Sequence, residues 1–351
     1  MTLGLILISS MIAVFTGNKR SSELNSATAD LQESARYAIE QISRDVRMAG
    51  YLGCLTDAAS LNIIGDTSPT TNFIRTAATG SAIQSASVWN PPIPGFTPPT
   101  TNTARPGTHA LLLQFAGPDF TSLIEEMNVG GLASPAAPIH AADDNGFSIG
   151  DLAVISNCEF GELFQISDVV PNGSNTLVSH AAASNNNTGA FHRSYGDDNS
   201  IAATRLMKFN SSIYYIGTNG LSNESGQPLY SLYQQTLPYD TTDNPPVELV
   251  TGVENFKVTY GVRNDVTGGV RFVEADSPLF DPALVNAIRV GILMVSYDEV
   301  AEVEDTNTYI IAGSPITPVA GAATDVDTHP VDRRIRFAFN TTIQIRNRRN
   351  L

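Results

Sequence analysis

The first 49 residues have the pattern of one long helix that changes character along its length. Residues 1–15 contain no charged side chain and are mainly Leu, Ile, Met and Val, which is typical of a helix buried in lipid or in a dry helical bundle. Proline is absent before Pro69, and no glycine follows Gly17 until Gly50. At 1.5 Å per residue the helix would be roughly 70 Å long, so we expect it to pack against something beyond its own domain.

The apolar side chains at the start of this helix are the ones that we expect to contact lipid or neighbouring helices. They are Leu3, Leu5, Ile6, Leu7, Ile8, Met11, Ile12, Val14 and Phe15. Lys19 and Arg20 end the apolar run.

Beyond these two basic residues the pattern becomes amphipathic. Apolar residues recur at helical spacing and predict a face that packs on a sheet: Leu24, Leu31, Ala35, Ala38 and Ile42. The opposite face has acids and arginines at salt-bridge spacing, each pair worth about 0.2–0.5 kcal/mol: Glu33 with Arg36, and Glu40 with Arg44.

The rest of the chain alternates apolar and polar positions in short runs, which predicts antiparallel strands. The clearest runs are residues 255–262, 288–295 and 334–346, and further runs are 109–115, 150–157, 162–169, 205–217 and 228–236. We interpret 55–107 and 180–200 as loops and Asn219-Gly220 as a turn. A sheet with one apolar face needs cover, and the amphipathic half of the helix is available. We therefore expect an α+β fold with a helix at 1–53 packed on an antiparallel β-sheet body with long loops at 54–351.

The charge lies in the body. The chain has a formal net charge of −15, while residues 18–49 carry five basic and five acidic side chains. An acidic body argues against nucleic-acid binding, which needs basic surface. Residues 290–332 hold eight acids and no Lys or Arg, and six arginines follow between Arg333 and Arg349. We favour pairing within one surface over contacts between neighbouring copies or partner subunits.

The sequence lacks the motifs of common enzymes and metal sites. No P-loop, nucleophile elbow, dinucleotide fingerprint, His-Glu-x-x-His motif or EF-hand loop is present. The histidines are scattered, and we expect them to be mostly solvated. Three acidic loop clusters could hold Ca²⁺, but turns rich in Asp, Asn and Gly are commoner than calcium sites: 143–146, 240–244 and 325–327. We predict no catalytic residue, no cofactor and no metal.

Cys54 and Cys158 are the whole thiol content of the chain. Neither has the spacing of a zinc ligand set. If the body lies outside the cytoplasm, the simplest arrangement is one disulfide closing a loop of about a hundred residues, and the alternative is two unrelated buried thiols.

Residues 36–54, RYAIEQISRDVRMAGYLGC, resemble the segment that closes the N-terminal helix in the PilW family of type IV pilus minor pilins. Three further stretches are similar to that family: 150–167 (GDLAVISNCEFGELFQIS), 252–262 (GVENFKVTYGV) and 333–348 (RRIRFAFNTTIQIRNR). Each cysteine lies in one of these segments, so the resemblance supports the Cys54–Cys158 disulfide.

The resemblance implies a pilin-like fold and a structural subunit rather than an enzyme. Such a subunit is held in the inner membrane with its body in the periplasm, is trimmed by a prepilin peptidase, and then enters the pilus through its helix. The implied partners are other minor pilins, the major pilin and a pilus-tip adhesin, in a tip complex that primes assembly and serves cell adhesion and twitching motility.

One feature departs from the family, whose leader-peptidase site places a Glu within the apolar segment. No acid precedes Glu23 here, and the apolar run is shorter than the roughly 20 residues of a membrane span, so we expect the natural start to lie upstream of Met1. A minor pseudopilin of type II secretion remains an alternative, as does a membrane-anchored extracytoplasmic enzyme or binding protein.

Overall fold

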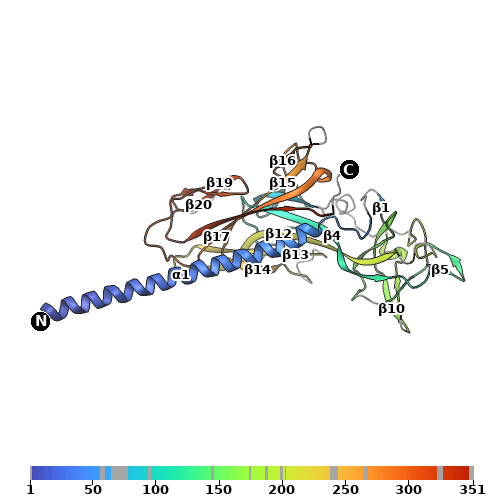
Figure 1. Ribbon diagram of the computed structural model, residues 1–351, viewed down its shortest axis with the longest axis horizontal. Coiled ribbons are helices and arrows are strands. Elements are labelled where there is room, and N and C mark those ends of the chain that lie inside the picture. The colour runs from blue at the N-terminus through green and yellow to red at the C-terminus, as the bar shows by residue number, and fades with distance from the viewer. Residues whose placement is uncertain are drawn as a thin grey trace.

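The computed structural model describes residues 2–55, 60–64, 78–93, 96–143, 146–173, 175–185, 189–197, 201, 203–237, 244–264, 268–321 and 327–347. Within these ranges, one long helix runs along a body of β-strands and projects beyond one end of it (Figure 1). This arrangement confirms the predicted α+β fold, a long N-terminal helix packed on an antiparallel β-sheet body.

Helix α1 spans Thr2–Met48. It ends where Gly50 adopts a φ of 73°, a left-handed conformation that glycine takes without the steric cost of a Cβ. The Gly50 amide then donates to the Gln114 carbonyl, so the chain leaves the helix directly into contact with the sheet. The helix therefore ends one residue before the end of the 49-residue helix that the sequence predicts.

The largest sheet has nine strands, ordered β1-β9-β8-β12-β4-β2-β3, with β13 and β14 continuing from β12. Their bounds are β1 (Leu61–Ile63), β2 (Ala78–Ser85), β3 (Val88–Asn90), β4 (His109–Ser122), β8 (Leu152–Ser156), β9 (Gly161–Gln165), β12 (Arg205–Ser222), β13 (Pro228–Thr236) and β14 (Val247–Thr251). The pairings are antiparallel except for β1 with β9. The long strands β12 and β4 join the part of the body beside α1 to the part beyond its end (Figure 1).

A second sheet of four antiparallel strands lies against the helix in the order β16-β15-β17-β21. It consists of β15 (Val253–Arg263), β16 (Val270–Val273), β17 (Val285–Val295) and β21 (Arg336–Gln344). Strand β21 is the last strand of this sheet, so one of its edges faces away from β17. That edge is the one beside α1 in the groove described below.

The remaining elements are short strands and 3₁₀ turns outside the two large sheets. They are β5 (Asn128–Val129), β6 (Leu132–Ala133), β7 (Ile139–Ala141), β10 (Asp168–Asn172), β11 (Asn175–Ser179), β18 (Tyr309–Ile311), β19 (Ser314–Val319), β20 (Thr328–Pro330) and the 3₁₀ turns Ala182–Ser184 and Pro282–Leu284. The short strands form sheets β10-β11-β7, β18-β19-β20 and β5-β6.

Two expectations from the sequence were wrong in detail. Residues 55–107 are not entirely loop, because β1, β2 and β3 all lie there. Asn219-Gly220 does not turn the chain, because both residues lie inside β12, which continues to Ser222. The reversal instead uses residues 223–227, where the Asn223 side chain accepts from the Gln227 amide at 2.8 Å.

The main core lies between α1 and the two sheets. It contains the buried helix face together with the inward side chains of β4, β12, β15 and β17, such as Leu111, Tyr214, Phe256 and Ile292. A separate aromatic cluster lies beside the proline-rich stretch that follows β3, which includes Pro91, Pro92, Pro98 and Pro99. In this cluster Trp89 is buried against Phe96 and Tyr215. The single tryptophan therefore anchors this segment to the sheet.

Candidate functional site

The described side chains in the first half of α1 are not buried. Every residue from Met11 to Ser26 is exposed, and the large apolar side chains among them reach high exposed fractions: Met11 76%, Ile12 59%, Val14 63% and Phe15 71%. Leu3, Leu5, Ile6, Leu7 and Ile8 belong to the same helix, but their side chains lie outside the described residues. Exposed apolar side chains on a projecting helix are typical of a surface that another molecule covers.

Within the described part of the chain, we find no helix with the length of apolar sequence needed to cross a bilayer.

The second half of α1 packs on the sheets as the amphipathic pattern predicts. Leu31 is 6% exposed, and Ala35, Ala38 and Ile42 are fully buried in the main core. Leu24 is different, since 40% of its surface is exposed, so its predicted place on the sheet was wrong. It precedes Leu31 by two helical turns, roughly 10 Å, and at that distance the helix has already left the core.

A buried polar contact fixes the rotation of the helix on the sheet. The Tyr214 hydroxyl on β12 donates to the Asp45 carboxylate at 2.5 Å, and Gln234 on β13 donates to the same hydroxyl at 3.0 Å. Burial raises the pKa of Asp45, although Tyr214 and Arg44 oppose the shift. Burial likewise raises the pKa of the Tyr214 hydroxyl. Polar groups buried at a helix–sheet interface are tolerated because they are hydrogen-bonded.

The end of the helix is tied to the body at two further points. The Asn347 side-chain amide donates to the Arg47 and Met48 carbonyls, each at 3.3 Å, which satisfies carbonyls that a helix end leaves without partners. Beyond it, Cys54 and Cys158 form a disulfide across 104 residues. Cys158 lies in the connection between the antiparallel strands β8 and β9.

The predicted salt bridges on the outer face of the helix were wrong. Arg44 lies 3.7 Å from Asp45 rather than beside Glu40, and no ion pair joins Glu33 to Arg36 among the described residues. Arg36 instead lines an open groove between the helix and the last strand of the sheet. Side chains that would have paired along the helix are thereby available to a partner outside it.

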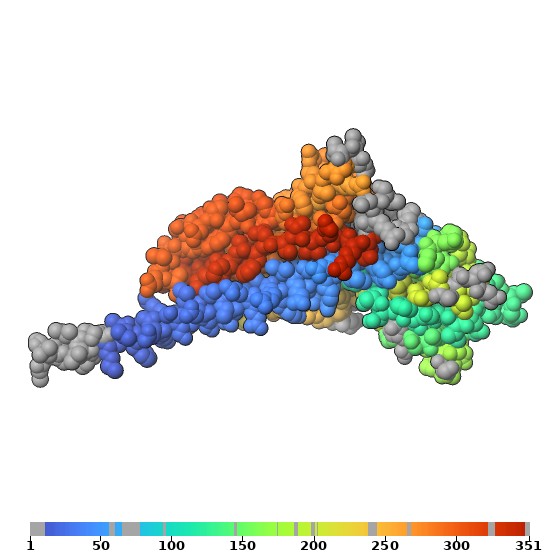
Figure 2. Space-filling view, in the orientation of Figure 1, coloured from blue at the N-terminus to red at the C-terminus, as the bar shows by residue number. Residues whose placement is uncertain are grey.

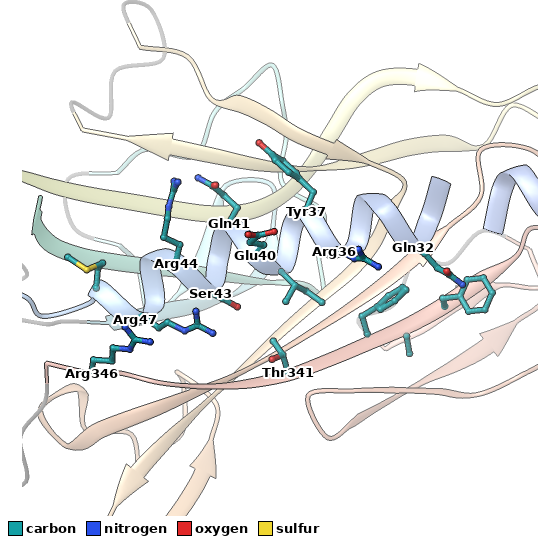
Figure 3. Close-up of a pocket in the computed structure, with 15 residues that line it drawn as sticks. Gln32, Arg36, Tyr37, Glu40, Gln41, Ser43, Arg44, Arg47, Thr341 and Arg346 are labelled. Atoms are coloured by element: carbon teal, nitrogen blue, oxygen red, sulfur yellow. The ribbon is translucent and has the colours of Figure 1, made fainter. Parts of the chain in front are cut away.

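This groove, between α1 and β21, has a volume of about 1230 Å³ (Figure 3). Its floor is apolar, with the half-buried Ile39, Phe337 and Phe339. Basic side chains stand along it, and Figure 3 draws Arg47 and Arg346 toward one end with Arg36 farther along the helix. The lining holds four arginines, Arg36, Arg44, Arg47 and Arg346, and one acid, Glu40, so the groove is basic although the chain has a net charge of −15.

On the other side of β21, the acids and arginines of the C-terminal region pair within the molecule. Arg336 is fully buried and binds Glu254 at 2.6 Å and Asp332 at 2.8 Å. Arg334 binds Asp332 at 2.8 Å, and Asp305 lies 3.2 Å from Arg336. The preference for pairing within one surface is confirmed for these residues.

This buried network depends on its arginines for charge balance. Burial alone would raise the pKa of Glu254, but the guanidinium of Arg336, with those of Arg105 and Arg334, outweighs burial and lowers that pKa. Removing one partner from such a cluster typically costs about 3–5 kcal/mol because a charge is left buried without compensation. The network thus stabilises the fold.

The histidines are also structural, and the expectation of mostly solvated rings was wrong for three of them. His109, His180 and His329 are at most 5% exposed. The Val258 amide donates to Nδ1 of His109 at 3.1 Å, and burial lowers the pKa of this ring to about 4. His180 and His329 bond to backbone carbonyls, so each ring fills a packing role.

No group of three or more metal-ligating side chains occurs within the described residues. Much of each loop cluster considered for calcium lies outside them, namely residues 144–145, 240–243 and 325.

The comparisons with known proteins bear on the second half of the chain. Residues 213–347 match the family model of Type IV Pilus-assembly protein W. This segment runs from the middle of β12 to the end of the last strand, and it contains the stretch 252–262 and nearly all of 333–348 on which the PilW resemblance was based. The resemblance to the PilW family is therefore confirmed, while the similar segments 36–54 and 150–167 lie outside the residues that match.

Among solved structures, a type IV-like pilin from Thermus thermophilus is similar to this chain. The two are 11% identical, with a TM-score of 0.35, and the alignment covers 91% of this chain and 97% of that one. No curated protein shows a significant match.

Proposed function

We propose that this protein is a minor pilin, a structural subunit of a type IV pilus that helps to prime assembly and sits in the complex at the pilus tip. The observation that carries the proposal is the match of residues 213–347 to the PilW family. The exposed apolar half of α1 supports it, because a filament subunit needs a surface that neighbouring subunits can bury.

In this proposal the two parts of the chain have different tasks. Residues 1–53 provide the assembly helix, whose apolar half is held in the inner membrane before assembly and among other helices afterwards. Residues 54–351 form the body, which is in the periplasm first and on the extracellular pilus later. An oxidising compartment favours the Cys54–Cys158 disulfide, which agrees with that placement.

The partners in this proposal are other minor pilins, the major pilin and a tip adhesin. The protein contributes packing rather than chemistry, because the buried acids, arginines and histidines described above already bond to one another or to the backbone.

Deleting the gene tests the proposal directly. We expect a sharp loss of surface pili and of twitching, both restored by the wild-type gene on a plasmid. Normal piliation in the deletion strain would contradict the proposal, and a defect in protein secretion with normal pili would favour the type II pseudopilin instead.

A matched pair of substitutions then tests the task assigned to the helix. Met11 on α1 and Leu132 on β6 are both 76% exposed, so an aspartate at either position leaves the folded body unchanged. We expect Met11→Asp to fail to restore pili and Leu132→Asp to restore them. Equal restoration by both variants would show that the exposed apolar run is not an assembly surface.

A further inference from the structure

The groove between α1 and β21 has a counterpart on the same molecule. Glu302, Val303 and Glu304 lie in the segment that follows β17, and all three are exposed, with Val303 at 76%. This acidic loop therefore presents one apolar side chain between two carboxylates. The groove presents an apolar floor of Phe337 and Phe339 below arginines, which is the complementary pattern.

The acidic loop lies at a different level along the helix from the groove. Glu302 is 3.6 Å from Arg20, and 79% of the Glu302 side chain and 64% of the Arg20 side chain are exposed. The loop therefore lies beside the exposed first half of α1. The groove arginines on the helix are Arg36, Arg44 and Arg47. They are roughly 24–40 Å farther along at 1.5 Å per residue. The backbone on either side of the loop is held before the start of β21, because the Ala301 amide donates to the Arg333 carbonyl and the Asp305 amide to the Asp332 carbonyl, and none of residues 302–304 lines the groove of its own molecule.

The two surfaces also face different directions. Sixteen residues separate Arg20 from Arg36, a rotation of roughly 160° about the helix axis at 3.6 residues per turn. A second copy that lies alongside, shifted by about 30 Å along the helix, brings its loop to the level of the groove. Such a contact uses two different patches, so it is head-to-tail rather than the two-fold contact of a symmetric dimer.

We propose that the groove between α1 and β21 binds the Glu302–Glu304 loop of a second copy of this chain. Val303 enters the floor at Phe337 and Phe339, while Glu302 and Glu304 pair with Arg36 and with the Arg47 and Arg346 end. The proposed filament function supplies the biological setting of this contact, but the contact itself is defined by these residues.

The short Glu302–Arg20 contact does not compete strongly with this arrangement. Exposed ion pairs contribute little, about 0–1 kcal/mol, and only one of the two carboxylates takes part in it. Binding in the groove would also cover Phe337 and Phe339, which the molecule leaves half-buried.

Cross-linking between two different variants of the full chain, in detergent, tests the contact. Thr341 lines the groove from the same face of β21 as Phe339, so Thr341→Cys and Val303→Cys place one thiol on each proposed surface. We expect a mixture of the two variants to give a cross-linked dimer at least ten times more abundant than either variant alone. Thr341→Cys mixed with Ile149→Cys is the control, because Ile149 is 67% exposed and lies far from the proposed loop in the chain.

Charge reversal separates a specific contact from chance proximity. All four substituted side chains are exposed, so folding is preserved. On the cysteine backgrounds, we expect Arg36→Glu with Arg47→Glu, or Glu302→Arg with Glu304→Arg, to lower the yield about tenfold. Combining a reversed groove with a reversed loop should restore the yield to within about threefold of the original pair.

Three results would overturn the inference: a yield no higher than that of the control, a yield unaffected by reversal, or a groove thiol that cross-links in cells to a different pilus protein. Each leaves the proposed function standing if the deletion strain lacks pili. Conversely, suppose that the cross-link is lost on charge reversal and restored by the double reversal, while the deletion strain has normal pili. This result would support the contact and contradict the proposed function.

Discussion

The two halves of α1 form one continuous helix but differ in how far their side chains are buried. From Met11 to Ser26 every side chain is exposed, although several are large and apolar. From Leu31 to Ala49 six apolar side chains are buried, and three of them are alanines; Figure 2 shows this part of the helix lying against the body. The buried half approaches the sheets closely because alanines leave room, and Asp45 fixes its rotation. Among the described side chains, the body thus buries only those of the second half of the helix.

Aspartate substitutions at two alanines, one in each half of the helix, should give the largest difference in stability between the halves. Ala38→Asp places an unpaired charge at a fully buried position, and we expect it to cost about 4–5 kcal/mol or to prevent folding. Ala13→Asp changes an exposed position in the other half and should alter the free energy of unfolding by less than about 0.5 kcal/mol. Urea unfolding of both variants in detergent measures the difference, and similar costs would show that the halves are not distinct.

The disulfide extends the packed half into the body. Replacing both cysteines, as in Cys54→Ser with Cys158→Ser, should lower the free energy of unfolding by about 3–4 kcal/mol, because the closed loop of 104 residues restrains the unfolded chain. We expect the wild-type protein under reducing conditions to match the double variant. If the loss is below about 1 kcal/mol in urea unfolding, the bond contributes little to holding the helix end.

A pair of isoleucines tests packing without charge. Ile42→Ala removes a fully buried side chain from the main core and should cost about 2–3 kcal/mol. Ile12→Ala removes a side chain that is 59% exposed and should cost less than about 0.5 kcal/mol while weakening retention in detergent micelles. Equal stabilities in thermal unfolding would contradict the assignment of the core to the second half.

The smallest effect is a pH dependence carried by Asp45. Burial raises the pKa of this carboxyl above its ordinary value of 3.8, so its native form favours the neutral state. The stability that it provides is complete below pH 3.8 and is lost as the pH rises through the raised pKa. Asp45→Asn should therefore be more stable than wild type at about pH 7, with the gap closing near pH 4. Urea unfolding at both pH values checks this, and a gap that widens on acidification would give the wrong sign.

Much of the fold is predictable because the periods are long and clear. The helix face repeats over three turns, and β13 spans the expected residues 228–236. Leu24 was misplaced because a helical period says where a face points and cannot say how far a sheet extends beneath it. Asn219-Gly220 was misread because the same pair that favours a turn also fits inside a long, irregular strand, where β12 shifts register between Thr218 and Ser222.

The burial of the polar side of β21 was harder to predict from the sequence. Alternation places Arg334 and Arg336 on the face opposite the apolar residues, which normally means solvent, yet both are nearly fully buried. The segment after β17 folds over that face and brings acids to them. The excess of acids before the arginines was the available signal for this pairing. Nothing in the spacing could show the groove, because it depends on how closely the helix approaches the strand edge.

The attachment of the helix end has a mechanical meaning. A pull applied along α1 from its free end would load the packed interface in shear, and the Asp45–Tyr214 contact would carry part of that load. Any load that passes the interface reaches a covalent link, because Cys54 is bonded to the turn between β8 and β9. Traction on the helix would then be shared with strands β8 and β9 of the largest sheet rather than peel the helix away from its end.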